Sequence, residues 1–316
     1  KTEIRQRPNI DSPSISTLYE DNIVVINQDV LGTNDSRRFK SRLWYETNEG
    51  YVYAPDVQPV KLELNQPVAS LPTFGDTPGF WAEVTVPFVD LKVDGDIRRS
   101  PRLQEMARPR FYYSQVLWVD GVSTNENGEI IYHVLEKFFS YGDEFWADGR
   151  AFRILSPEDL APINPEVPDK KIVVDLSHQT VSCYEGKDEI LYTLVSTGAK
   201  YNIYGEVVDN WATPVGENHV VNRKYVSLHM GGGDTKASGY EEFAVSYTSI
   251  FASGGVAFHS TYWHNSWGDP MSHGCVNLKP DDAKFIYRWT LPQVPYETGS
   301  IEQQNYDGTK VRVFEF

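Results

Sequence analysis

The chain has 316 residues, which suits two or three domains better than one, and 40% of them are hydrophobic. Its formal net charge is −15, and no basic tract interrupts the acidic excess, which argues against nucleic acid as a partner. No run of about 18 apolar residues is present, so the sequence predicts no transmembrane segment. Aromatic residues reach 13% alongside many glycines and prolines, and this composition favours short strands and turns.

The first half of the chain has the pattern of β structure. An apolar strand signal covers residues 16–30, and two short strands follow around an Asn-Glu-Gly turn. The same strand pattern recurs more weakly further along the chain. This second occurrence contains a strand pair across residues 125–128 and a closing segment at 143–155. These patterns predict two small β-barrel modules, over residues 1–65 and 66–165, as an internal repeat. The segment WYET…GYVYAPDVQPV resembles bacterial Src-homology-type β-barrels, and the second module is the more divergent.

A segment with four prolines, residues 155–171, is a predicted linker to a third domain over 166–316. Alternating apolar residues predict that this domain opens with an antiparallel hairpin. Residues 225–242 are polar and Gly-rich, which predicts a loop or flap with the glycines at 231–233 as the hinge of a lid. A final strand is predicted at 308–316. The whole chain is therefore predicted to be mainly β.

One helix is predicted, and it begins at Pro280. Proline is tolerated in the first helical turn, and two aspartates follow it at the positive end of the helix dipole. Ala283, Ile286 and Trp289 are spaced to share one apolar face.

The chain has two cysteines, too few for a disulfide framework. Cys183 lies in a strand-like run, which predicts a structural thiol. Cys275 lies in the stretch SHGCVNL, and His259 ends an apolar strand sixteen residues earlier. A cysteine nucleophile needs a base and N–H donors for the oxyanion, so His259 is the candidate base. Gly274 leaves room for substrate beside the backbone, and the N–H groups of Gly274 and Cys275 are the candidate donors.

A zinc site is the alternative for the same stretch, because mixed His and Cys coordination is common. Its ligands would be His259, His264, His273 and Cys275. The nucleophile is favoured over this alternative, and no metal or other cofactor is predicted. The remaining histidines are predicted to be ordinary surface or packed residues, with His229 beside the flap as the one that could touch substrate; they are His133, His178, His219 and His229.

The run FHSTYWHNSWGDPMSHGCVNL is very similar to the signature of the L,D-transpeptidase (YkuD-like) family, in which a His precedes Ser-His-Gly-Cys by roughly fourteen residues. The STGA and TPVG runs also resemble family features, and the resemblance covers about residues 170–316. It implies a YkuD-like β-sandwich or barrel with a short helix after the catalytic Cys. It also implies action on peptidoglycan tetrapeptide stems, through a Cys thioester, to give 3→3 cross-links. Acylation by carbapenems is expected with it.

The resemblance also assigns roles. Cys275 would be the nucleophile, His259 the base and Ser260 the residue whose backbone carbonyl orients that imidazole. His273 would hold the loop and adjust Cys275, while Asn277 stands where many relatives have Arg and can only hydrogen-bond to substrate. The aromatic residues between base and nucleophile either line the acyl-donor pocket or simply pack the loop; they are Tyr262, Trp263, His264 and Trp267.

Three alternatives stay open at this point. Water could replace the acceptor amine, which would make the protein an L,D-carboxypeptidase. The chain could instead be a cell-wall-binding protein with a silent catalytic domain. The two modules could position the enzyme on the wall or serve only as spacers or packing partners for the catalytic domain. The opening KTEIRQRPN is not a signal peptide, so the chain is either cytoplasmic or a trimmed mature form, and the resemblance implies an extracytoplasmic place in the cell envelope.

Overall fold

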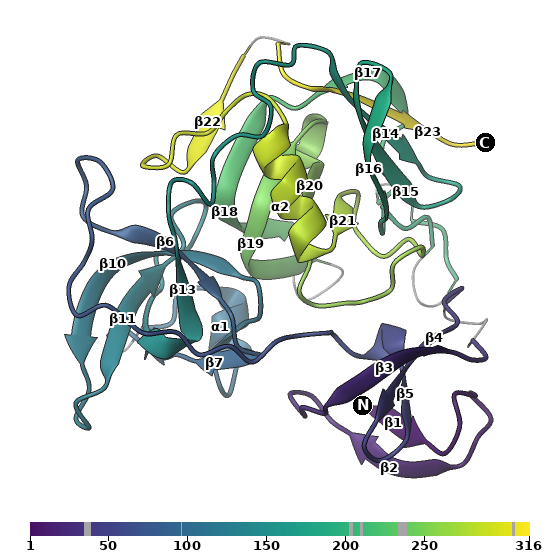
Figure 1. The fold of residues 1–316 in the computed structure, drawn as a ribbon, viewed down its shortest axis with the longest axis horizontal. Coiled ribbons are helices and arrows are strands. Elements are labelled where there is room, and N and C mark those ends of the chain that lie inside the picture. Colours follow the sequence, from purple (N-terminus) through teal and green to yellow (C-terminus); the bar gives the residue numbers. More distant parts are fainter. Residues whose placement is uncertain (35–38, 96, 202–204, 209–210, 233–238, 305–306) are drawn as a thin grey trace.

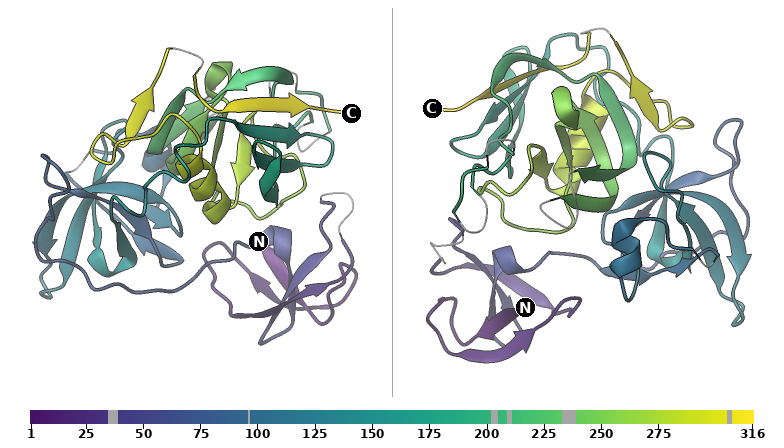
Figure 2. Two further views of the ribbon diagram at one scale, coloured as in Figure 1. Left: turned by 45° about the horizontal axis from the view of Figure 1, so that its top comes forward. Right: turned by 180° about the vertical axis from the view of Figure 1, so that it is seen from behind.

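The computed structural model describes residues 1–34, 39–95, 97–201, 205–208, 211–232, 239–304 and 307–316. Within them the fold is mainly β, as predicted, and consists of three successive β units (Figure 1). The first two units lie on one side of the large C-terminal unit and are joined to each other by an extended segment (Figure 2). None of the described helices has the length and apolar character needed to cross a bilayer.

The first unit is a five-stranded antiparallel sheet in the order β2-β1-β5-β4-β3. The strands around the Asn-Glu-Gly turn are present as predicted. The single strand predicted at 16–30 is wrong, because the chain turns between two strands there: Asn22 N–H donates to the Tyr19 carbonyl, and Asp21 has a φ of 62°. The strands are β1 (Thr2–Arg5), β2 (Ser14–Leu18), β3 (Ile26–Leu31), β4 (Leu43–Thr47) and β5 (Tyr51–Tyr53), followed by a 3₁₀ turn, η1 (Ala54–Asp56).

The middle unit is a six-stranded sheet in the order β13-β6-β10-β11-β12-β8, with a separate pair of strands, β7 and β9. The hairpin across residues 125–128 is confirmed. The closing segment 143–155 is two strands separated by a 3₁₀ turn, η2 (Gly149–Ala151). The elements are β6 (Phe80–Val84), β7 (Phe88–Asp90), β8 (Lys92–Val93), α1 (Pro101–Glu105), β9 (Arg110–Tyr112), β10 (Val116–Thr124), β11 (Ile130–Leu135), β12 (Glu144–Asp148) and β13 (Phe152–Leu155). The Src-homology resemblance of the two modules and their boundaries stay predictions.

The C-terminal unit contains two five-stranded sheets, ordered β16-β15-β14-β23-β17 and β21-β20-β19-β18-β22. The predicted hairpin is β14 with β15, and the predicted last strand is β23, which lies parallel to β14. The strands are β14 (Lys170–Asp175), β15 (Thr180–Glu185), β16 (Asp188–Leu194), β17 (Gly216–Val220), β18 (Arg223–Gly232), β19 (Tyr240–Ile250), β20 (Ala257–Ser260), β21 (Val276–Leu278), β22 (Ser300–Glu302) and β23 (Lys310–Phe314), with a 3₁₀ turn, η3 (Ser253–Gly255), before β20.

The predicted helix is α2 (Pro280–Trp289), which packs against β19 and β20 (Figure 1). Ala283, Ile286 and Trp289 are all buried, so the apolar face expected from the sequence is the packed one. Cys183 is fully buried on β15, where burial raises the pKa of its thiol, as expected for a structural cysteine.

The predicted loop at 225–242 is wrong for most of its described part. Residues up to Gly232 belong to β18, which pairs with β19 so that Gly231 faces Glu241 and Gly232 faces Tyr240. The strand forms because Val226 and Leu228 are buried, and their burial outweighs the weak strand propensity of the glycines. Gly231 and Gly232 are therefore paired strand residues and not the hinge of a lid. The third glycine of the predicted hinge, Gly233, lies outside the described residues.

Candidate active site

A pocket of about 110 Å³ opens beside Cys275 and His259. It lies over the sheet that contains β18 to β21, and the loop before β21 forms one of its walls. Its lining residues are Met230, Tyr240, Glu242, His259, Trp263, Met271, Ser272, His273, Cys275 and Asn277.

The parallel pairing of β20 with β21 brings the predicted base and nucleophile to one place. Phe258 pairs with Val276 and His259 with Asn277, so Cys275, which directly precedes β21, lies beside the strand of its base. The loop between them closes a separation of sixteen residues in sequence. Both side chains are almost fully buried, at 1% exposed for His259 and 9% for Cys275.

His259 is held in one tautomer by the next residue. Its Nδ1 lies 2.9 Å from the Ser260 carbonyl oxygen, and a carbonyl can only accept, so Nδ1 carries the proton. Nε2 is then left with a lone pair, as a general base requires. Burial lowers the pKa of His259 to about 4, against the opposing effect of the Ser260 carbonyl. The imidazole is therefore neutral near pH 7.

Cys275 rests as a thiol. Burial raises its pKa to about 11, and the backbone N–H of Ala257 only partly offsets that rise. Its Sγ lies 3.9 Å from the carbonyl oxygen of Gly255, a distance that suits a weak S–H donor. The resting pair is thus a neutral thiol with a neutral imidazole, and the thiolate forms only when His259 takes the proton.

Gly274 has a φ of +123°, a backbone conformation that residues with a side chain rarely adopt. Its carbonyl accepts a hydrogen bond from Thr213 Oγ1 at 2.8 Å. Its N–H donates to Ser272 Oγ at 3.1 Å, so this N–H is occupied in the structure. That differs from the prediction that Gly274 and Cys275 both offer free donors to an oxyanion.

Thr213 and Ser272 fix the loop that carries the nucleophile. Thr213 Oγ1 accepts from Gly198 N–H at 2.9 Å while it donates to the Gly274 carbonyl. Ser272 Oγ donates to the Cys275 carbonyl at 2.5 Å. A Cβ on Gly198 would lie 2.0 Å from the Trp211 carbonyl oxygen, so only glycine fits there. The STGA and TPVG runs noted in the sequence therefore meet behind Cys275.

His273 lies between two aromatic rings. Its ring centroid is 3.9 Å from that of Trp211 and 4.9 Å from that of Tyr240. The role predicted for His273, to hold the loop and adjust Cys275, stays a prediction.

Asn277 contacts His264, and the tautomer of that histidine settles which way the amide points. Ser266 N–H donates to His264 Nδ1 at 3.2 Å, so the proton of the neutral ring is on Nε2. The Asn277 amide lies 2.9 Å from Nε2, and it must therefore present its oxygen there. The Asn277 NH₂ then takes the other amide position, which is buried and has no partner within the described residues. Asn277 also lines the pocket.

Of the four aromatic residues predicted between base and nucleophile, only Trp263 lines the pocket. It is 37% exposed, and its ring centroid lies 5.7 Å from that of His259. Tyr262, His264 and Trp267 pack the loop instead, which was the alternative reading. Trp267 Nε1 donates to Asn265 Oδ1 at 2.7 Å, for example.

The four residues of the zinc alternative do not form a chelating set. Among the described residues, the structure brings three metal-type ligand atoms together only at Asp94, His133 and Glu144, in the middle unit.

Several pocket residues were missed by the sequence analysis. Met230 and Tyr240 lie in the segment read as a flap, so strand alternation was the signal that could have found them. Tyr240 is close enough for the charge of a Cys275 thiolate to add to burial in raising the tyrosine pKa to about 12. The other pocket-lining residues that were not predicted are Glu242, Met271 and Ser272.

The middle unit contacts a residue that lines the pocket, and both N-terminal units contact the loop that follows β20. From α1 of the middle unit, Arg102 Nη1 pairs with Glu242 Oε2 at 2.7 Å. Tyr112 of the same unit stacks on Tyr262, with the rings 5.6 Å apart and 10° from parallel. From the first unit, Tyr45 Oη accepts a hydrogen bond from Asn265 Nδ2 at 2.9 Å.

His229 is buried between two carboxylates and does not line the pocket. Its Nδ1 lies 2.9 Å from Glu136 Oε2, and its Nε2 lies 3.3 Å from Glu241 Oε1. Burial alone would lower the pKa of His229, but the hydrogen bond to Glu136 and the two negative charges outweigh burial and raise it. It is thus a packed residue at the contact between the middle and C-terminal units.

Comparison with known proteins identifies the C-terminal unit. Residues 169–313 match the YkuD family, described as an L,D-transpeptidase catalytic domain. No curated protein sequence matches the chain.

Solved structures of L,D-transpeptidases also align with it. One from Enterococcus faecium is 24% identical over 48% of this chain and 51% of its own, with a TM-score of 0.34. One from Mycobacterium smegmatis is 16% identical over 61% of this chain and 98% of its own, with a TM-score of 0.35. One from Stackebrandtia nassauensis is 26% identical over 50% of this chain and 60% of its own, with a TM-score of 0.29. The chain thus spans about half the length of the Enterococcus faecium enzyme.

Proposed function

Since residues 169–313 are a YkuD L,D-transpeptidase catalytic domain, we propose that the protein is a peptidoglycan L,D-transpeptidase with Cys275 as its nucleophile. Its substrates would be tetrapeptide stems, and its product a 3→3 cross-link. The observation that carries this proposal is the placement of Cys275 and His259 in one pocket, with the base tautomer fixed by Ser260.

In the first half-reaction, Cys275 Sγ attacks the carbonyl of the third stem residue while His259 Nε2 takes the thiol proton. The Cys275 N–H is the proposed donor to the oxyanion, because the N–H of Gly274 is occupied by Ser272. The tetrahedral intermediate breaks its bond to the terminal D-Ala, whose amine receives the proton from the His259 imidazolium. A thioester on Cys275 and free D-Ala result.

In the second half-reaction, the side-chain amine of another stem attacks the thioester. His259 takes a proton from that amine and returns it to the Cys275 sulfur as the thioester bond breaks. The products are the cross-linked dimer and the starting enzyme. Water in place of the amine would give a tripeptide, which is the L,D-carboxypeptidase alternative.

Carbapenems are proposed inhibitors, because their strained lactam carbonyl offers Cys275 an acyl group in the same pocket. A catalytic domain from Enterococcus faecium has been solved acylated by ertapenem. The substrate also places the proposed site of action outside the cytoplasm, in the cell envelope. The silent-domain alternative conflicts with a complete thiol and base in the pocket.

The test is to incubate purified protein with disaccharide-tetrapeptide and to separate the products by mass. Cross-linked dimer supports the transpeptidase, and tripeptide alone supports the carboxypeptidase. The Cys275→Ala variant should form neither product. Cys183→Ala is the matched control, because it removes the other thiol from a site far inside the core and should keep activity. No product with the unaltered protein contradicts the proposal.

A further inference from the structure

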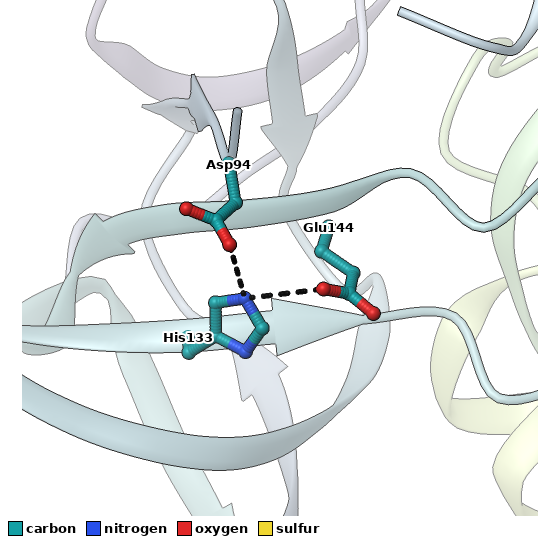
Figure 3. A group of neighbouring side chains, drawn as sticks. All are labelled: Asp94, His133 and Glu144. Atoms are coloured by element: carbon teal, nitrogen blue, oxygen red, sulfur yellow. Dashed lines mark ion pairs between the residues drawn. The ribbon is translucent and has the colours of Figure 1, made fainter. Parts of the chain in front are cut away.

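Three side chains of the middle unit converge on one point of its surface, away from the pocket. His133 Nε2 lies 3.6 Å from Asp94 Oδ2 and 3.7 Å from Glu144 Oε2 (Figure 3). The three atoms all lie within 4.8 Å of one another. The three residues come from separate segments of the chain, so no local sequence motif predicts the group.

The sheet itself brings the three residues together. His133 on β11 pairs with Trp146 on β12, so Glu144 lies two residues along β12 on the same face. Asp94 follows directly after β8, and its N–H donates to the Glu144 carbonyl at 2.8 Å. Gly121 on β10 faces His133 and leaves room for it, since a Cβ there would lie 2.7 Å from the His133 Cβ.

Two of the three side chains are oriented by partners behind them. His133 Nδ1 lies 2.6 Å from Asp120 Oδ1, so Nδ1 carries a proton and the neutral ring directs the lone pair of Nε2 at the two carboxylates. Nε2 is buried and has no hydrogen-bond partner in the described residues. Asp94 Oδ1 accepts from Trp146 Nε1 at 3.2 Å, which leaves Asp94 Oδ2 facing His133.

We propose that Asp94, His133 and Glu144 bind a divalent transition-metal ion, with Zn²⁺ the best fit. Zinc takes His nitrogen and carboxylate oxygen at about 2.0–2.2 Å, so ligand atoms around a tetrahedral ion lie about 3.3 Å apart. The observed 3.6 and 3.7 Å need only small side-chain rotations to reach that spacing. The imidazole favours zinc over magnesium or calcium, and the Asp120–His133 pair is the carboxylate–imidazole arrangement common behind metal ligands.

The proposed ion has a structural role. It joins β8, a strand of two residues at the edge of the sheet, to β11 and β12. The Asp94 and Glu144 side chains are 50% and 48% exposed, so solvent reaches the remaining coordination position. The proposal is independent of the peptidoglycan chemistry. Its rival is a protonated His133 that pairs with the carboxylates without any metal.

The test uses the full chain with Cys275→Ala, which removes the pocket thiol as a competing zinc ligand. Calorimetric titration with Zn²⁺ after chelator treatment should show one bound equivalent, and thermal unfolding should shift upward with Zn²⁺ but not with Mg²⁺. The double variant with His133→Gln added to Cys275→Ala should no longer bind this one equivalent of Zn²⁺. Asp120→Asn should weaken it by about 10- to 100-fold, the usual effect of losing an outer-shell partner.

His178→Gln is the matched control, because within the described part of the chain His178 pairs with a single carboxylate, Asp175, at 2.7 Å. It should leave zinc binding unchanged. Glu144→Gln is a second variant, at an exposed position. If His133→Gln fails to fold, the loss of zinc binding can still be measured with Glu144→Gln. Unchanged zinc binding in both His133→Gln and Glu144→Gln overturns the proposal, as does the absence of binding by the parent chain. An equal response to Mg²⁺ overturns the choice of a transition metal.

Discussion

Arg102 Nη1 lies 2.7 Å from Glu242 Oε2, so a residue of the middle unit holds a carboxylate that lines the pocket of the C-terminal unit. The hydroxyl of Tyr262 donates to the same oxygen at 2.7 Å. The pocket wall is therefore built jointly by two units of the chain. The middle unit therefore packs against the C-terminal unit at the wall of the pocket.

Replacing Arg102 by Met should lower kcat/KM by about tenfold, because Glu242 would lose its cation and move beside the bound substrate. The melting temperature should change little, since this arginine side chain is 34% exposed. Arg150→Met is the control: Arg150 pairs with Asp148 and Glu129 elsewhere on the middle unit. Equal activity of the two variants in a steady-state assay would argue against a joint pocket wall.

Because Cys275 and His259 are both neutral at rest, the alkylation rate of Cys275 should depend on pH. Because the pKa of Cys275 is raised to about 11, the thiolate fraction at pH 7 is small and grows about tenfold per pH unit. Alkylation of Cys275 by iodoacetamide, followed by intact mass, should therefore accelerate steadily from pH 7 to pH 10. A rate that stays flat over this range would instead reveal a preformed thiolate–imidazolium pair.

Thr213→Val should damage both stability and activity. The change keeps the side-chain shape but removes the hydroxyl that joins Gly198 N–H to the Gly274 carbonyl, both of which are buried. Leaving these groups unpaired costs about 1–3 kcal/mol each, measurable by urea unfolding. Thr213→Ser keeps the hydroxyl and should restore most of the activity. Failure of Ser to do better than Val would show that the methyl group matters more than the hydrogen bonds.

His229 should make stability depend on pH. Its folded-state pKa is raised above the unfolded value of about 6.5, so its stabilising charge is fully present below that value and is lost as pH rises through the folded-state pKa. The groups that face it are Glu136 and Glu241, together with the rings of Tyr141 and Phe243. Melting temperatures measured upward from pH 6 should fall in the parent chain and fall less in His229→Gln. Parallel curves for the two proteins would contradict this assignment.

Much of the C-terminal unit could be predicted from sequence, because its signals are local. The β14–β15 hairpin follows from alternation, and α2 follows from Pro280 and the spacing of Ala283 and Ile286. The pairing of Cys275 with His259 was predicted from their positions in the sequence and from the family resemblance, and β20 and β21 bring the two residues together.

The parts that sequence reasoning missed depend on contacts between distant segments. The glycines of β18 suggested a loop, yet pairing with β19 keeps them in a strand and brings Met230 and Tyr240 to the pocket. Tyr262 looked like a pocket residue, but its ring stacks on Tyr112 of another unit. The contact between Tyr262 and Tyr112 has no signal within one stretch of sequence.

The proposed acylation of Cys275 by a tetrapeptide stem depends on His259 as the base. Brief incubation with disaccharide-tetrapeptide, acid quenching and peptide mass mapping tests it most directly. We expect a tripeptide thioester on the peptide that contains Cys275, together with release of D-Ala, in the unaltered chain and in Cys183→Ala. We expect no adduct in Cys275→Ala and a strongly reduced one in His259→Gln. An adduct on any other residue, or full acylation of Cys275 in His259→Gln, would contradict it.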